Sequence, residues 1–111
     1  MQIGLDIVEV DRIKRLAFRN KLFLSRVFSS PEIKYCSTKK NKWQHFAVRF
    51  AAKEAVWKAL SKSGIRLKDI SVNRNSQGKP LIFLKGKKAA QIHISLSHSQ
   101  HYAAAVAVTM K

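Results

Sequence analysis

Carboxylates are scarce in this chain, and two of them have unusual surroundings. Among 111 residues only six are acidic: Asp6, Glu9, Asp11, Glu32, Glu54 and Asp69. Asp6 lies within a run of alternating apolar residues, where Asp is a poor strand former, and Glu54 lies in an alanine-rich segment. Asp6 is therefore either an exposed edge residue or a ligand held on a rigid element. Together with water and phosphate oxygens, the two carboxylates would suit Mg²⁺, provided that the fold brings them together.

Glu54 and Lys58 are spaced as a helical i, i+4 pair, and two interpretations are open. Such a pair is commonly an ordinary surface contact worth about 0.3 kcal/mol. The surrounding helix, however, has two apolar faces, and a covered charge is costly unless it is paired or bound to a ligand. Lys53 is also unusual, because it falls within the aromatic face of the same helix.

A further polar cluster lies at the end of a predicted strand and comprises Ser95, Ser97, His98 and Ser99. Hydroxyls, an imidazole and free backbone N–H groups at a turn suit phosphate binding. Taken singly, each of these residues is more often part of a polar hairpin tip. The single cysteine, Cys36, excludes an intrachain disulfide, which fits a reducing cytoplasm. We expect Cys36 to be a semi-buried helix residue rather than a nucleophile.

The chain is strongly basic, with 22 Lys and Arg residues against 6 Asp and Glu and a formal charge of +16. Such a charge attracts nucleic acid, an anionic membrane or an acidic protein. No apolar run approaches the ~18 residues of a membrane-spanning helix, and a cytoplasmic protein is expected. Arg12, Arg15 and Arg19 belong to a basic first third of the chain, which by itself is more often a solvated surface than a specific interface.

The element that carries Asp6 is a strand predicted over residues 2–10, because apolar and polar residues alternate there. Ile3, Leu5 and Ile7 share one face, and Gly4, Asp6 and Val8 share the other. Asp11 would then be the N-cap of a following helix.

Glu54 and Lys58 are carried by a long helix predicted over residues 43–62 and ended at Ser63-Gly64. Its aromatic face comprises Phe46, Phe50, Trp57 and Leu60. A second stripe contains only small residues, so that another element could approach closely: Ala47, Ala51, Ala55 and Ala59.

The remaining segments complete one α+β domain, residues 1–111. A short helix is predicted over residues 20–28, and a second runs to Ser37 from Ser30 as cap, with Pro31 at the first helical position. Strands are predicted over residues 69–74, 81–84, 92–97 and 102–110, and a short basic helix or loop over 85–90.

Five segments, taken in order, resemble a known family. They are Gly4-Leu5-Asp6-Ile7-Val8 followed by Arg12-Ile13, then Arg49-Phe50-Ala51-Ala52-Lys53-Glu54-Ala55 with Lys58-Ala59, then Gly78-Lys79-Pro80, then Ser95-Leu96-Ser97-His98-Ser99, then Tyr102-Ala103-Ala104-Ala105. Over nearly the whole chain this pattern is similar to holo-acyl-carrier-protein synthase, the short bacterial type of phosphopantetheinyl transferase. The resemblance implies the phosphopantetheinyl transferase fold, an antiparallel β-sheet packed with one long helix and several short helices.

The resemblance also implies a reaction and the residues that perform it. Such enzymes move the 4′-phosphopantetheine arm of coenzyme A onto a serine of apo-acyl carrier protein, which supports fatty acid biosynthesis and releases adenosine 3′,5′-bisphosphate. By the match, Asp6 and Glu54 correspond to the Mg²⁺ ligands, and Lys58 corresponds to a lysine near the pyrophosphate. These three residues form the implied catalytic set. The residues implied in binding coenzyme A are Arg49, Lys53, Lys58, Gly78, Lys79, Pro80, Ser97 and His98. Those implied in binding the acidic carrier protein are Arg12, Arg15 and Arg19. The family also implies a homotrimer with active sites between subunits.

Two other functions compete with this interpretation. A small basic nucleic-acid-binding domain would account for the charge, but the sequence has no helix-turn-helix, zinc or RNP-like pattern, and it would leave Asp6 and Glu54 unexplained. Trp43 and Trp57 follow helical periodicity, which favours core packing over base stacking. A catalytically inactive carrier-protein-binding module is disfavoured by the intact set of Asp6, Glu54 and Lys58.

Overall fold

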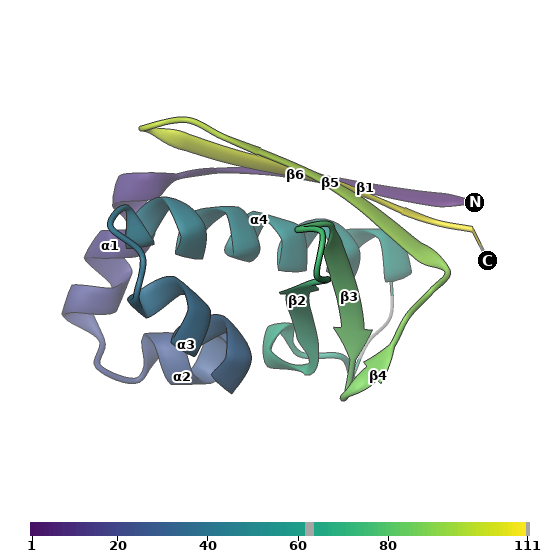
Figure 1. Ribbon diagram of the computed structural model, residues 1–111, viewed down its shortest axis with the longest axis horizontal. Helices are drawn as coiled ribbons and strands as arrows, with labels where there is room; N and C mark the ends of the chain where they lie inside the picture. The colour runs from purple at the N-terminus through teal and green to yellow at the C-terminus, as the bar shows by residue number, and fades with distance from the viewer. Residues whose placement is uncertain (62–63, 111) are drawn as a thin grey trace.

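A central helix organises the molecule. The computed structural model describes residues 1–61 and 64–110. Helix α4 (Lys42–Leu60) lies between two layers (Figure 1), and one of them is an antiparallel sheet in the order β1-β6-β5. The strands of this sheet are β1 (Gln2–Glu9), β5 (Ile92–His98) and β6 (Tyr102–Thr109). The other layer contains three helices, α1 (Val10–Arg19), α2 (Phe23–Val27) and α3 (Ser30–Ser37), and a second sheet. A short 3₁₀ turn, η1 (Leu67–Asp69), leads into that sheet, whose strands are β2 (Ile70–Arg74), β3 (Pro80–Leu84) and β4 (Lys87–Lys88). The predicted α+β class is confirmed, with two small sheets among the described residues where one was expected.

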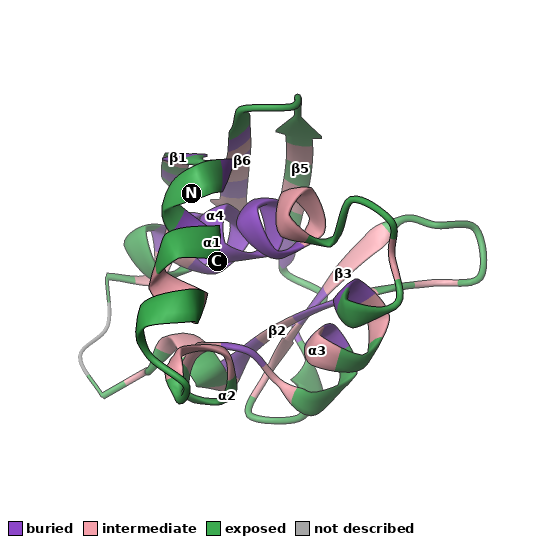
Figure 2. Cartoon of the chain, turned by 90° about the vertical axis from the view of Figure 1, so that its left-hand side faces the viewer, coloured by how far each residue is buried: buried purple, intermediate pink, exposed green. Residues whose placement is uncertain are grey.

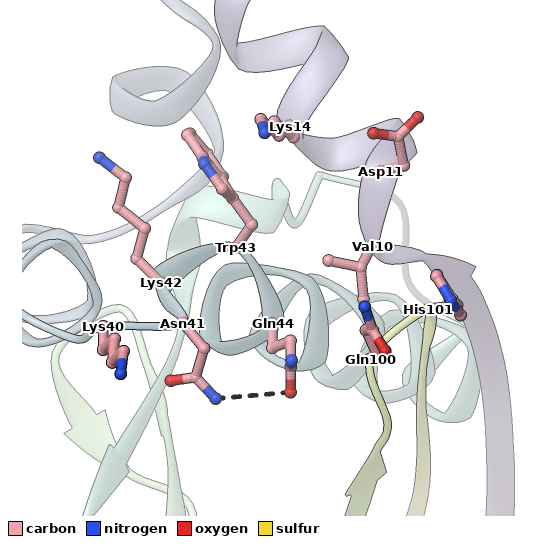
Figure 3. Close-up of a pocket in the computed structure, with 10 residues that line it drawn as sticks. All are labelled: Val10, Asp11, Lys14, Lys40, Asn41, Lys42, Trp43, Gln44, Gln100 and His101. Carbon is pink, nitrogen blue, oxygen red and sulfur yellow. Dashed lines mark hydrogen bonds between the residues drawn. The ribbon is translucent and has the colours of Figure 1, made fainter.

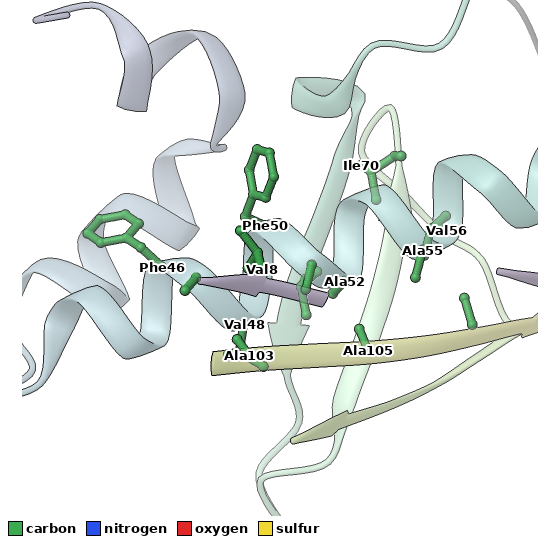
Figure 4. Packing of buried hydrophobic residues seen from close by; sticks show 14 of the residues in the cluster. Val8, Phe46, Val48, Phe50, Ala52, Ala55, Val56, Ile70, Ala103 and Ala105 are labelled. Atoms are coloured by element: carbon green, nitrogen blue, oxygen red, sulfur yellow. The ribbon is translucent and has the colours of Figure 1, made fainter. Parts of the chain in front are cut away.

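Close packing between β1 and α4 explains the stripe of alanines. Ala47, Ala51, Ala55 and Ala59 are all at most 1% exposed. A Cβ atom added to Gly4 would overlap the carbonyl oxygen of Ala55, so only glycine allows β1 to lie this close to the helix. Figure 4 shows Ala103 and Ala105 of β6 facing the same helix. The sheet and helix thus meet through small residues, and the neighbouring side chains on both elements are fixed relative to each other.

The other face of β1 is open. Ile3, Leu5 and Ile7 are 60%, 64% and 67% exposed, although they are the more apolar face of the strand. Most of α4, by contrast, is coloured as buried in Figure 2. The sequence pattern therefore predicted the strand and the grouping of its residues, but it did not show that the apolar face is uncovered in a single chain.

Several predicted boundaries move by one or two residues. Helix α1 begins at Val10, whose N–H donates to the His101 carbonyl, so Asp11 lies in the first turn and pairs with Arg15 instead of capping the helix. The cap of α3 is Ser29, not Ser30, because its hydroxyl and Glu32 form a reciprocal capping box.

Other predictions concern the ends of α4 and the segment before β5. Ser61 adopts a left-handed conformation, with φ 51°, and terminates α4. The predicted helix end at Lys62 and Ser63 lies outside the described residues. Residues 85–90 contain the short strand β4, not a helix. Within the part of the chain described, no helix is long and apolar enough to cross a membrane.

The aromatic face of α4 is only partly buried. Phe46 is 1% exposed and contacts Phe28, with ring centroids 5.0 Å apart. Trp43 packs between Phe46 and Phe18. Trp57 departs from the prediction, since it is 42% exposed and its indole N–H donates to the Ile65 carbonyl at 2.9 Å. This hydrogen bond gives the indole N–H of the exposed Trp57 a partner near the C-terminal end of α4.

Candidate active site

Asp6, Glu54 and Lys58 come together where β1 crosses α4. The Lys58 ammonium donates to Asp6 Oδ1 at 3.2 Å and to the Leu5 carbonyl at 3.0 Å. Burial raises the pKa of Glu54, and the nearby charge of Asp6 raises it further, while Lys58 and Arg12 act in the opposite direction. These four side chains therefore form one electrostatic cluster. Lys58 forms its ion pair with Asp6 on the neighbouring strand. It therefore does not form the helical surface pair with Glu54.

The chemistry of this cluster fits a hard divalent cation. Asp6 and Glu54 supply oxygen donors from two elements that Gly4 and Ala55 hold in close contact. The pKa of Glu54 is raised first by burial and then by repulsion from the Asp6 carboxylate, and a cation would relieve that repulsion. Among the described residues, no group of three or more His, Cys, Asp or Glu side chains could complete a coordination shell. Water and substrate phosphates would have to supply the other ligands, as is usual for Mg²⁺.

Arg49 and Gly78 line a second feature, a cavity of about 460 Å³. Arg49 is 1% exposed, and its guanidinium lies 4.4 Å from the Tyr35 ring centroid. Its Nε has no hydrogen-bond partner among the described residues. Arg74 lines the same cavity and donates to the Gly78 carbonyl at 2.6 Å. Two guanidinium groups at one cavity, one of them buried with an unused N–H, are suited to an anion.

His98 is linked to the Arg49 region through aromatic contacts. Its Nδ1 lies 2.9 Å from Gln44 Oε1, and its ring centroid lies 5.8 Å from that of His45. His45 in turn lies 5.8 Å from Tyr35, the residue beneath Arg49. Burial lowers the pKa of His45, and Arg49 and His98 lower it further, which favours the neutral imidazole.

Three other predicted residues lie apart from these contacts. Lys79 precedes β3, which begins at Pro80, and both residues line a separate hollow toward β5 that Arg49 does not line. Ser97 is exposed on β5, one residue before His98.

Lys53 requires a correction, because its side chain is fully buried. Its ammonium lies 2.7 Å from Glu32 Oε1 and also donates to the Leu67 carbonyl at 3.1 Å and to the Ile70 carbonyl. Glu32 is satisfied as well, since it accepts the N–H groups of Ser29 and Val72. The predicted contact of Lys53 with nucleotide phosphates therefore does not fit this fold. Lys53 faces α3 and β2, and its charge is used to join them to α4.

A basic pocket escaped the sequence analysis. Figure 3 shows its walls, the starts of α1 and α4 and the turn between β5 and β6, around a cavity of about 310 Å³. Its basic lining comprises Lys14, Lys40, Lys42 and His101. Gln44, which contacts His98, also lines it. The available signal was the run of lysines just before the long helix, which was interpreted only as a basic loop.

The three arginines predicted to bind a partner are all exposed on α1. Arg12 lies close enough to Glu54 to lower its pKa. Arg15 is paired with Asp11 one turn earlier, and Arg19 ends the helix. The basic face of α1 thus begins beside the carboxylate cluster and runs away from it.

Comparison with known proteins agrees with this arrangement. A family model described as the 4′-phosphopantetheinyl transferase superfamily matches residues 2–107. The chain therefore belongs to the 4′-phosphopantetheinyl transferase superfamily, and within it to the holo-acyl-carrier-protein synthases, as the following relatives show.

The holo-acyl-carrier-protein synthase of Chloroherpeton thalassium is 43% identical, over 97% of this chain and 96% of the relative. That of Thermodesulfovibrio yellowstonii is 44% identical, over 96% and 95%. Among solved structures, the Helicobacter pylori holo-acyl-carrier-protein synthase in complex with coenzyme A has a TM-score of 0.82 at 33% identity, with 96% of this chain and 98% of that chain covered. The family and fold expected from the sequence motifs are confirmed.

Proposed function

We propose that this protein transfers the 4′-phosphopantetheine group of coenzyme A to a serine of apo-acyl carrier protein. The products are holo-acyl carrier protein and adenosine 3′,5′-bisphosphate, and the reaction supports fatty acid biosynthesis. The observation that carries the proposal is the meeting of Asp6, Glu54 and Lys58 at the crossing of β1 and α4. Two relatives named holo-acyl-carrier-protein synthase, matched over 96% and 95% of their own length, add independent support.

The chemistry requires a proton acceptor and stabilisation of negative charge. The serine oxygen forms a bond to the phosphorus that carries the pantetheine arm, the phosphoanhydride bond to the nucleotide breaks, and the serine proton is released. We assign this role to Glu54, acting directly or through a bound water, as the partly buried carboxylate beside Asp6 and Lys58. Lys58, one turn further along α4, would stabilise charge on the leaving phosphate. Mg²⁺ held by Asp6 and Glu54 would neutralise the non-bridging pyrophosphate oxygens when bound.

Coenzyme A binding would use the cavity lined by Arg49 and the basic pocket near His98. Arg49 and Gly78 line one cavity, and the buried Nε of Arg49 is unpaired among the described residues. His98 is placed beside the basic pocket through Gln44, and Ser97 adjoins it. Lys79 and Pro80 lie at the start of β3, next to Gly78 in sequence. Negatively charged phosphates of the nucleotide fit these positive surfaces.

The carrier protein would dock on α1. Arg12, Arg15 and Arg19 present three guanidinium groups on one exposed helix that begins beside Glu54. The overall charge of +16 would steer an acidic protein toward this face and make the encounter rate depend on salt.

A homotrimer with shared active sites is part of the proposal. Ile3, Leu5 and Ile7 form an exposed apolar strip on the sheet face opposite α4, and such a strip commonly marks a protein–protein interface. The strip lies on the same edge strand as Asp6, so a neighbouring subunit seated there would lie next to the site, around the edge of the sheet.

Mass spectrometry of apo-acyl carrier protein tests the reaction. The carrier is incubated with this protein, coenzyme A and Mg²⁺, beside the variant Glu54→Gln and an EDTA control. We expect a gain of one phosphopantetheine mass that is lost in both controls. No gain with several apo carrier proteins, with folded enzyme, would contradict the proposal, and RNA binding would then be tested because of the charge.

A further inference from the structure

Lys58 occupies the oxygen atoms on which a cation would be expected. Its ammonium contacts one carboxylate oxygen of Asp6 and the carbonyl oxygen of Leu5, at 3.2 Å and 3.0 Å. The Lys58 side chain is 49% exposed and that of Asp6 only 16% exposed. The ammonium thus approaches the carboxylate from the solvent side and partly covers it.

These contacts are made by hard oxygens, which are also the ligands of Mg²⁺ and Mn²⁺. A divalent cation on Asp6 would lie close to the ammonium, and like charges at such distances repel. The exposed, flexible Lys58 is free to move, whereas β1 and α4 are fixed by the contact of Gly4 with Ala55. Binding of a cation therefore requires Lys58 to give up Asp6.

We propose that Lys58 is an internal counter-ion of the carboxylate cluster, which holds Asp6 while the site is free of metal and competes with a divalent cation for it. The inference rests on the proposed function only in taking Asp6 and Glu54 as the metal ligands. With a cation bound, Lys58 would no longer hold Asp6, and its ammonium would be free to reach the substrate pyrophosphate. Lys58 thereby couples metal binding to the positioning of a second positive charge, at a cost in metal affinity.

Titration of the protein with Mn²⁺ alone, followed by electron paramagnetic resonance, tests this competition without any catalytic turnover. We expect Lys58→Met to bind Mn²⁺ about 1.5- to fivefold more tightly than the wild type, the range that corresponds to an exposed ion pair. Lys58→Gln, which keeps a side-chain amide able to contact the Leu5 carbonyl, should change the affinity in the same direction. The matched control is Lys34→Met, which removes one charge from an exposed position on α3 and should leave the affinity unchanged.

The other outcomes separate this inference from the proposed function. Equal or weaker binding in both Lys58 variants, including undetectable binding in all samples, overturns the counter-ion role. An equal gain in Lys34→Met also overturns it, because net charge alone would then be the cause. Asp6→Asn identifies the site: if it binds Mn²⁺ as the wild type does, the assignment of Asp6 as a metal ligand is itself wrong. Loss of binding in Asp6→Asn with no gain in the Lys58 variants leaves the metal site standing and refutes only the competition.

Discussion

Glu54 illustrates how one residue can be unfavourable for stability and useful for function. Its carboxylate is partly desolvated and faces Asp6, and both effects raise its pKa. The folded protein therefore binds a proton at Glu54 more tightly than the unfolded chain does. In the pH window between the ordinary pKa of glutamate and the raised value, stability of the metal-free protein must fall as pH rises.

Replacement of Glu54 by an uncharged residue should remove this loss of stability at rising pH. We expect Glu54→Gln to be more stable than the wild type at neutral pH without metal, by less than about 1 kcal/mol, and the difference to shrink at acidic pH where the wild-type carboxyl is protonated. Urea denaturation in EDTA at several pH values measures it. Added Mg²⁺ should stabilise the wild type and not the variant. A variant that is less stable than the wild type at neutral pH would contradict the strained-carboxylate interpretation.

At the scale of elements, the spacing of β1 and α4 sets the geometry of the site. Gly4→Ala would force its methyl group into the Ala55 carbonyl and move β1 away from α4. We expect a loss of about 1–3 kcal/mol in stability and a fall in transfer rate of at least tenfold, because Asp6 shifts relative to Glu54. Urea denaturation and the mass-spectrometric rate measure the two effects.

Gly86→Ala serves as the control for Gly4→Ala. Gly86 has a φ of +84° and open space around it, so alanine there costs about 1 kcal/mol through the backbone alone. Gly86 lies in the turn between β3 and β4, away from the carboxylates. The stability of this variant should fall while its transfer rate is retained. Equal rates in Gly4→Ala and Gly86→Ala would show that close packing of β1 does not position the site.

The same elements show what the sequence could and could not predict. Alternation in β1 and the alanine stripe of α4 are local patterns, so both elements and their facing sides were predictable. The partners of charged residues were not, because they are set by tertiary pairing. Lys53 meets Glu32 from α3, and Lys58 meets Asp6 from β1. The family motif indicated that Asp6, Glu54 and Lys58 belong together. It also assigned Lys53 to the binding of coenzyme A, and only the buried position of Lys53 in the structure corrected that assignment.

At the scale of the whole molecule, two surface properties remain to be matched with partners. The basic α1 face suits an acidic protein, whereas the apolar strip of Ile3, Leu5 and Ile7 suits another copy of the chain. Because Asp6 lies between Leu5 and Ile7, the strip and the carboxylate cluster share one strand and point to its opposite faces. Assembly through the strip would therefore place a neighbouring subunit next to the site without covering α4.

A charge placed in this strip should prevent assembly. Ile3→Glu puts a carboxylate on the exposed face of β1, and in a trimer that carboxylate would be buried in an apolar interface, which is costly. We expect light scattering coupled to gel filtration to report a trimer for the wild type and a monomer for the variant, and the transfer rate to fall with assembly because each site needs two subunits. Leu22→Glu, at a residue 50% exposed beyond α1, is the matched control and should remain trimeric. A wild-type monomer whose specific activity does not change on dilution would show that one chain holds a complete site, and the exposed strip of β1 would then have some other partner.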